Sequence, residues 1–111
     1  MEQEKTELLK GTLDMLILRV VAFGAIHGYA ISQRIQQISK DFFQVPEGSL
    51  YPALHRLEDH GWLQAKWDET ETGREAKFYT LTRAGRKQLG TEMVNWERLS
   101  EAVALILKTA E

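Results

Sequence analysis

The sequence predicts a mainly α-helical fold with one small β-hairpin and a long C-terminal helix, and three observations lead to this prediction. Apolar residues in 49–60 recur at the three-to-four-residue spacing of an amphipathic helix. Residues 62–82 alternate apolar and polar side chains on both sides of a polar turn, as a hairpin does. Residues 82–108 carry apolar side chains at spacings of three and four, which is typical of one long helix.

The composition is that of a globular protein and excludes several classes of function. The chain has 111 residues, which is enough for one domain of ordinary size. It contains no cysteine, so disulfides, thiolate metal sites and cysteine nucleophiles are excluded. It has no run of about 18 apolar residues that could span a membrane. Its polar, partly acidic N-terminus is unlike a secretory signal, and we expect a cytoplasmic protein without membrane contact.

The first helix is predicted from about Leu8 to Phe23. Its main apolar stripe consists of Leu9, Leu13, Leu16, Ile17, Val20 and Val21. Further apolar residues lie on its other sides, namely Met15, Leu18 and Ala22. Because a helix that is apolar nearly all round is buried on more than one face, we expect a second chain to cover part of it.

The second helix is predicted from roughly Tyr29 to Ser39, after Gly24 and Gly28. Three isoleucines are expected to face inward: Ile31, Ile35 and Ile38. The connector 40–46 leaves room for a short extended piece. His27 lies directly before this helix, and we expect its ring to cap the helix or to pack against a neighbour.

The third helix begins between Pro46 and Ser49 and ends at Gly61. Proline is tolerated in a first helical turn and is costly deeper in a helix, so a start at Ser49 suits Pro52 better. A start near Pro46 would require a distorted first turn in which Gly48 makes space for the proline ring. Its predicted buried stripe consists of Leu50, Ala53, Leu54 and Leu57.

The hairpin and the last helix follow directly. Strands are predicted at 62–67 and 76–82 around a turn at 70–75, with Gly73 at the tip and with Trp62 and Trp67 as packing residues. Thr82 is a good N-cap for a helix that runs to about Lys108, or about 40 Å at ~1.5 Å per residue. Glycines at positions 85 and 90 should weaken its first turns only slightly.

The order helix–helix–helix–strand–strand is that of a winged helix-turn-helix, here in residues 1–81, followed by the helix of residues 82–111. So long a helix cannot bury its apolar seam against the preceding domain, and pairing with a second copy by two-fold symmetry is the simplest solution. The first helix is the expected co-partner in this homodimer. The predicted dimerisation seam consists of Leu89, Met93, Trp96, Leu99, Val103, Ile106 and Leu107.

The polar face of the third helix is the candidate site for contact with double-stranded DNA. Its hydroxyl, phenol, imidazole and guanidinium groups can donate to phosphate oxygens and base edges. We expect Tyr51 and Arg56 to contact phosphates, whereas Ser49, Pro52 and His55 lie near bases. The alternative is a solvated helix face, with Tyr51 packed and Arg56 paired with Glu58 or Asp59.

The charge pattern points to local DNA contact. The formal net charge is −2, whereas nucleic-acid-binding domains usually carry a basic surplus. Residues 62–88 nevertheless hold six basic and four acidic side chains. Arg74 at the tip of the hairpin could enter a minor groove and Lys77 could contact a phosphate. The alternative is that both are solvated residues beside Glu71 and Glu75.

These features together resemble the PadR family of bacterial transcriptional regulators, in its smaller size class, over essentially the whole chain. The matching segments are Leu9-Lys-Gly-Thr-Leu-Asp14, His27-Gly-Tyr29, Gly48-Ser-Leu-Tyr-Pro-Ala-Leu-His-Arg-Leu-Glu58 with Gly61, Lys77-Phe-Tyr-Thr-Leu-Thr82 and Ala84-Gly85. The resemblance implies a homodimeric regulator, usually a repressor, that binds a palindromic operator and is often released by a small effector. Relatives often carry a strongly basic wing, which Arg74-Glu75-Ala76-Lys77 interrupts here. A winged helix that binds proteins instead of DNA is the alternative.

Trp96 is the candidate effector-binding residue. On the dimer seam, two indoles related by symmetry could flank a cavity and stack a flat hydrophobic ligand, as in multidrug-sensing relatives. The alternative is that Trp96 belongs only to the core of the dimer interface. No cofactor and no metal are expected, because the histidines lack ligand spacing. No constellation of residues indicates an enzyme.

Overall fold

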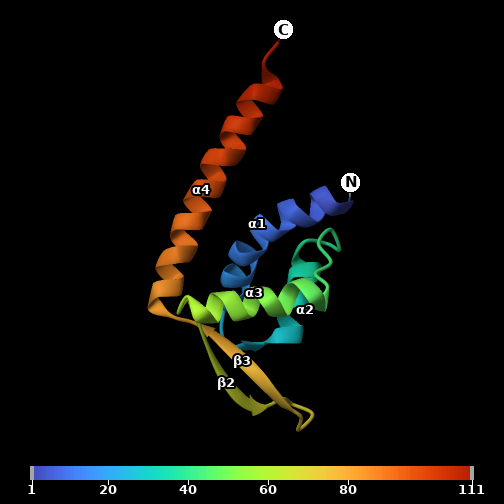
Figure 1. Cartoon of the computed structure of the whole chain (residues 1–111), viewed down its shortest axis with the longest axis vertical. Helices are drawn as coiled ribbons and strands as arrows, with labels where there is room; N and C mark the ends of the chain where they lie inside the picture. The colour runs from blue at the N-terminus through green and yellow to red at the C-terminus, as the bar shows by residue number, and fades with distance from the viewer. Residues whose placement is uncertain (1, 111) are drawn as a thin grey trace.

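The computed structural model describes the backbone of residues 2–110 and the side chains of residues 12–110. It confirms the predicted fold class of helices, a small sheet and a long last helix. Three helices and the sheet form a head, from which the last helix projects (Figure 1). The elements are α1 (Glu2–Val21), β1 (Ile26–His27), α2 (Gly28–Ile38), α3 (Glu47–Asp59), β2 (Leu63–Glu69), β3 (Glu75–Leu81) and α4 (Arg83–Lys108).

Helix α1 is the centre of the head and begins earlier than predicted, at Glu2. Leu13, Ile17 and Leu18 are at most 2 % exposed, because α1 packs against α2, α3, α4 and β3 of the same chain. Of the residues expected to need a second chain, Leu18 is therefore covered within its own chain, whereas Met15 and Ala22 are only partly buried. The side chain of Leu9 lies outside the described residues.

Helix α2 buries two of its three predicted isoleucines. Ile31 and Ile35 are at most 4 % exposed, whereas Ile38 is 61 % exposed. The inward position predicted for Ile38 was wrong, because this last residue of α2 lies on the surface beside Phe23 and Arg34.

Helix α3 begins at Glu47, with Pro46 as its N-cap. The Pro46 carbonyl accepts hydrogen bonds from the amides of Ser49 and Leu50, both at 2.9 Å. Pro52 therefore lies in the second turn, where it offers the Gly48 carbonyl no amide hydrogen. Outside the backbone of its own helix, a Cβ atom at Gly48 would meet no atom within 4 Å, so a side chain at this position would not touch the ring of Pro52.

The apolar stripe of α3 is confirmed, since Leu50, Ala53, Leu54 and Leu57 are at most 1 % exposed. This stripe packs into the head against α1 and α2, with β2 close by. The opposite face of α3 therefore points outward.

The sheet has three antiparallel strands in the order β1-β3-β2. The predicted hairpin is present, with Leu63 opposite Leu81 and Glu69 opposite Glu75. Its turn contains Gly73 at φ +81°, a left-handed conformation that glycine adopts readily. Strand β1, which pairs its two residues with β3, was not predicted.

Burial decreases along β2 as the hairpin, or wing, leaves the head. Leu63 is 2 % exposed, Ala65 is half-buried and Trp67 is 64 % exposed. The packing role predicted for Trp67 was therefore wrong. Trp62 packs at the edge of the core and stacks on the His60 ring with centroids 4.4 Å apart.

Helix α4 begins as predicted, because the Thr82 hydroxyl accepts a hydrogen bond from the Gly85 amide at 2.9 Å. Gly85 does more than weaken the helix, since a Cβ atom there would collide with the carbonyl oxygen of Trp62. Beyond its first turns, α4 leaves the head and projects alone (Figure 1). None of the helices among residues 2–110 is both long and apolar enough to cross a membrane.

Candidate nucleic-acid interface

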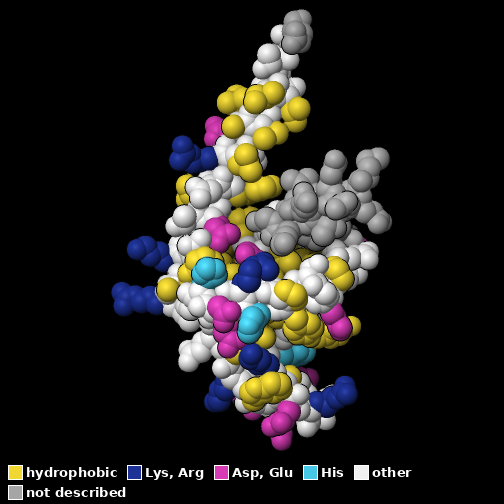
Figure 2. All heavy atoms as spheres, viewed as in Figure 1, with side chains coloured by type: hydrophobic (Ala, Val, Ile, Leu, Met, Phe, Trp, Pro, Cys, Tyr) yellow, Lys and Arg dark blue, Asp and Glu magenta, His cyan; other side chains and the backbone are white. Residues whose placement is uncertain are grey.

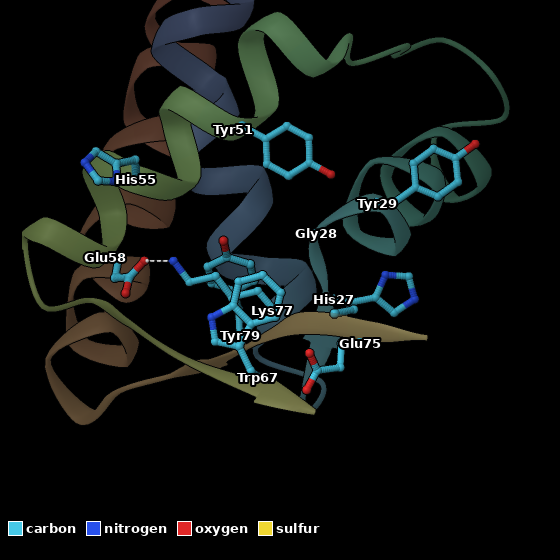
Figure 3. Close-up of a pocket in the computed structure, with 11 residues that line it drawn as sticks. His27, Gly28, Tyr29, Tyr51, His55, Glu58, Trp67, Glu75, Lys77 and Tyr79 are labelled. Carbon is cyan, nitrogen blue, oxygen red and sulfur yellow. Dashed lines mark hydrogen bonds and ion pairs between the residues drawn. The ribbon is translucent and has the colours of Figure 1, made fainter. Parts of the chain in front are cut away.

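A recess of about 500 Å³ lies between the outer face of α3, the start of α2 and the wing. Figure 3 shows Tyr51 of α3 above it, with Lys77 and Tyr79 of β3 below. The outward face of α3 and the wing therefore form one continuous surface around the recess.

Most of the α3 residues predicted to contact DNA lie on this surface. Tyr51, Pro52 and His55 are exposed, and Ser49 is half-buried. The Tyr51 ring also explains a glycine in the sequence, because a Cβ atom at Gly28 would lie 3.0 Å from its Cε1 atom. Gly28 thus lets Tyr51 lie against the start of α2 while the tyrosine as a whole stays 44 % exposed. The sequence pattern did not indicate this contact.

Arg56 is held from behind by α1. Its Nη2 atom donates to the Asp14 carboxylate at 2.8 Å, and both side chains are partly buried. The sequence offered Glu58 or Asp59 as its acidic partner, but neither pairs with it among the described residues. Asp59 instead lies 3.6 Å from the Nε2 atom of His55, in a pair that is largely exposed.

Lys77 crosses from the wing to α3. Its ammonium donates to the Glu58 carboxylate at 3.0 Å, as the dashed line in Figure 3 shows, and lies 5.7 Å from the centre of the Tyr79 ring. The hydrogen bond to Glu58 raises the pKa of Lys77 above its usual value of 10.5, against the lowering effect of desolvation. Burial raises the pKa of the neighbouring Tyr79 phenol.

Arg74 is the exposed cation at the end of the wing. The turn beneath it is ordered by backbone hydrogen bonds, from the Thr70 amide to the Arg74 carbonyl at 2.7 Å and from the Gly73 amide to the Thr70 carbonyl at 2.9 Å. Within the described part of the chain, the Arg74 guanidinium forms no ion pair. It is therefore the predicted DNA-contact cation that stands free at the surface.

His27, at the edge of this surface, packs against a ring. His27 is the N-cap residue of α2, but its side chain forms no capping hydrogen bond. Its ring instead meets Phe78 edge-on, with centroids 5.5 Å apart. Among the residues that the structure describes, no three histidine or carboxylate side chains are grouped as metal ligands.

A second surface lies on α4, where apolar side chains gather along the projecting helix (Figure 2). The exposed large apolar residues of α4, between 41 % and 78 % exposed, are Met93, Val94, Trp96, Leu99, Val103, Leu105, Ile106 and Leu107. Leu89 is only 6 % exposed and belongs to the core of the head, so its predicted place in the dimer seam was wrong.

A smaller recess of about 190 Å³ separates α4 from α1. Met15, Leu16 and Arg19 line it from α1, and Met93, Trp96 and Glu97 line it from α4. Trp96 therefore faces both an apolar recess and the exposed apolar surface of α4.

The chain is similar to known regulators over most of its length. A model of the Transcriptional regulator PadR-like family matches residues 17–91. A transcriptional regulator from Mycobacterium tuberculosis is 32 % identical over 87 % of this chain and 87 % of its own length. The negative transcriptional regulator PadR from Bacillus subtilis is 28 % identical over 82 % of this chain, but the match spans only 50 % of that protein. The crystal structure of a PadR-like transcriptional regulator from Bacillus cereus superposes with a TM-score of 0.81 and 28 % identity, covering 94 % of this chain and 99 % of that one.

Proposed function

The chain belongs to the PadR-like family of transcriptional regulators, and from this premise we propose that it is a repressor that binds a palindromic operator as a homodimer. The family implies DNA binding, and its members are transcriptional regulators, not enzymes. The name of the Bacillus subtilis relative, a negative regulator, supports repression as the outcome.

The outward face of α3 beside the wing is the observation that carries the DNA-binding proposal. Its exposed polar groups lie in the N-terminal half and the middle of the helix, so this part of α3 can enter a major groove while the wing reaches along the duplex. We assign direct contact to the residues that no carboxylate of the head holds: Ser49, Tyr51, Pro52, His55, whose partner Asp59 is itself largely exposed, and Arg74. Arg56 and Lys77 are paired with Asp14 and Glu58 of the head, and each can contact a phosphate only if it leaves its carboxylate.

The apolar surface of α4 supports the homodimer. Complete burial of a large apolar side chain contributes roughly 1.5–3 kcal/mol, and α4 leaves several such side chains in water. The half-buried Met15 and Leu16 of α1 extend this surface toward the head. A two-fold pair of chains would cover both helices and place the two α3 helices on one side of the assembly, which a palindromic operator requires.

The recess between α1 and α4 supports a small hydrophobic effector. Its lining is mainly apolar, with Trp96 offering a flat surface on which an aromatic ligand could stack. A ligand in this recess would displace α4 relative to α1 and so change the distance between the two α3 helices of the dimer. If Trp96 serves only the dimer interface, apolar aromatic compounds will leave DNA binding unchanged.

Selection from a library of random duplexes tests the DNA-binding proposal directly. We expect the enriched sequences to be two-fold symmetric and their binding to weaken steeply as salt concentration rises. A reporter gene placed downstream of the enriched sequence should be expressed less when the protein is present. Absence of enrichment, together with recovery of a specific protein partner, would favour a winged helix that binds proteins instead.

A further inference from the structure

We call the outward face of α3, with Ser49, Tyr51, Pro52 and His55, the reading face. Three side chains that could supply positive charge on or beside this face lie next to carboxylates. Arg56 pairs with Asp14 at 2.8 Å, Lys77 pairs with Glu58 at 3.0 Å, and the His55 imidazole lies 3.6 Å from Asp59. A surface that binds DNA by charge alone would leave its cations free for phosphates. The ion pairs therefore call for an explanation other than phosphate binding.

The pair between Glu58 and Lys77 is the one best placed to affect DNA binding. It joins the last turn of α3 to β3 at the edge of the recess, and its side chains are 33 % and 35 % exposed. An ion pair this exposed contributes only about 0–1 kcal/mol to stability. Its main consequence is therefore the position of the ammonium, which Glu58 keeps beside α3 and the Tyr79 ring instead of in solvent.

A lysine ammonium released beside the reading helix would add a phosphate contact to any duplex, because phosphates carry no sequence information. In a complex with unrelated DNA the protein can shift until this ammonium meets a phosphate. In the operator complex the base contacts fix the register, so the additional contact contributes less. Releasing Lys77 would thus strengthen binding to unrelated DNA more than binding to the operator.

We propose that Glu58 is a specificity-determining residue, which holds the Lys77 ammonium and so withdraws one sequence-independent phosphate contact from the reading face. The proposal rests on the DNA-binding function proposed above. In this proposal, the side chains of the reading face and Arg74 of the wing distinguish the operator from unrelated DNA. Lys77 instead connects the wing to α3 through its ion pair with Glu58.

The substitution Glu58→Gln tests this proposal, with Glu75→Gln as the matched control. Glu75 lines the same recess and is exposed, but it forms no ion pair within the described part of the chain, so both variants change the net charge equally. Binding to the selected duplex and to a scrambled duplex of equal length is measured by fluorescence anisotropy over a range of salt concentrations. Circular dichroism confirms that both variants are folded.

For Glu58→Gln we expect tighter binding to the scrambled duplex, a lower ratio of selected to scrambled affinity, and a salt dependence steeper by about 0.9 in the log–log slope, which corresponds to one added phosphate contact. Glu75→Gln should leave the slope unchanged. Adding Lys77→Met to Glu58→Gln should restore the slope of the unaltered protein, and Lys77→Met alone should not change it.

Two results would overturn the proposal while leaving DNA binding intact. One is an equal effect of Glu58→Gln and Glu75→Gln, which would show a general effect of charge. The other is a shallower slope for Lys77→Met alone, which would show that Lys77 already contacts a phosphate. If the unaltered protein binds neither duplex at low salt, the proposed function fails, and this inference fails with it.

Discussion

Helices α1 and α4 are both rich in apolar residues, but their own chain covers them to different degrees. Ile17 and Leu18 of α1 are completely buried in the head, whereas Val103 and Ile106 of α4 are 45 % and 74 % exposed. The apolar character of a helix therefore shows that it needs a cover without showing what provides it. For Ile17 and Leu18 the cover is α2, α3, α4 and β3, and for the exposed residues of α4 we propose a second copy of the chain.

The difference between the two helices can be tested by placing the same charge in each of them. Ile17→Asp puts a carboxylate into the closed core of the head, which costs several kcal/mol and is comparable with the whole stability of a small domain. We expect the variant to lose its cooperative urea transition, as measured by circular dichroism. A folded Ile17→Asp variant would show that the core around α1 is not closed.

The matched substitution in α4 is Ile106→Asp, combined with Val103→Asp. Because both positions are exposed in the single chain, we expect the head to stay folded while the dimer dissociates and the affinity for DNA falls by the loss of the second reading helix. Sedimentation velocity measures the dissociation. An unchanged sedimentation coefficient would place the dimer interface elsewhere.

The junction between the head and α4 can be tested with two glycines. Gly85→Ala should lower the free energy of unfolding by about 1–3 kcal/mol, because its Cβ atom would collide with the Trp62 carbonyl. Gly90→Ala is the control, since a Cβ atom there meets open space and alanine favours the helix by about 0.5–1 kcal/mol. Urea denaturation should therefore give opposite signs for the two variants, and equal signs would contradict the packing described for Gly85.

The smallest expected effect is on the pH dependence of the head. The pKa of Lys77 is raised by its hydrogen bond to Glu58, so this contribution to stability is complete below its usual pKa of 10.5 and is lost as pH rises through the higher folded value. The raised pKa of Tyr79, caused by burial, acts in the same direction. We expect the urea midpoint to fall as pH rises above 10.0, the usual pKa of tyrosine, and to fall less in Tyr79→Phe combined with Lys77→Met. Identical pH profiles for the two proteins would contradict these shifts.

The spacing of apolar residues and the capping residue were sufficient to predict those elements that depend only on residues near them in the sequence. The stripe of α3 follows from Leu50, Ala53, Leu54 and Leu57 at helical spacing, and the start of α4 follows from Thr82 as N-cap. Strand β1 was missed because its two residues are too few to show a period.

The candidate site depends on contacts that no local pattern contains. Arg56 pairs with Asp14, 42 positions away, and Lys77 pairs with Glu58, 19 positions away. The need for glycine at position 85 likewise comes from the carbonyl of Trp62. The sequence thus predicted which side chains face outward on α3 but not which of them are already held by carboxylates. The seam on α4 stays a prediction, apart from Leu89.

Sedimentation equilibrium of the full chain over a range of protein concentrations tests most directly whether a second copy covers α4. We predict twice the mass of a single chain throughout the micromolar range, because the exposed side chains from Met93 to Leu107 form an apolar surface too extensive to remain in water. The mass of a single chain at these concentrations would contradict the two-fold pair, and with it the proposed reading of a palindromic operator.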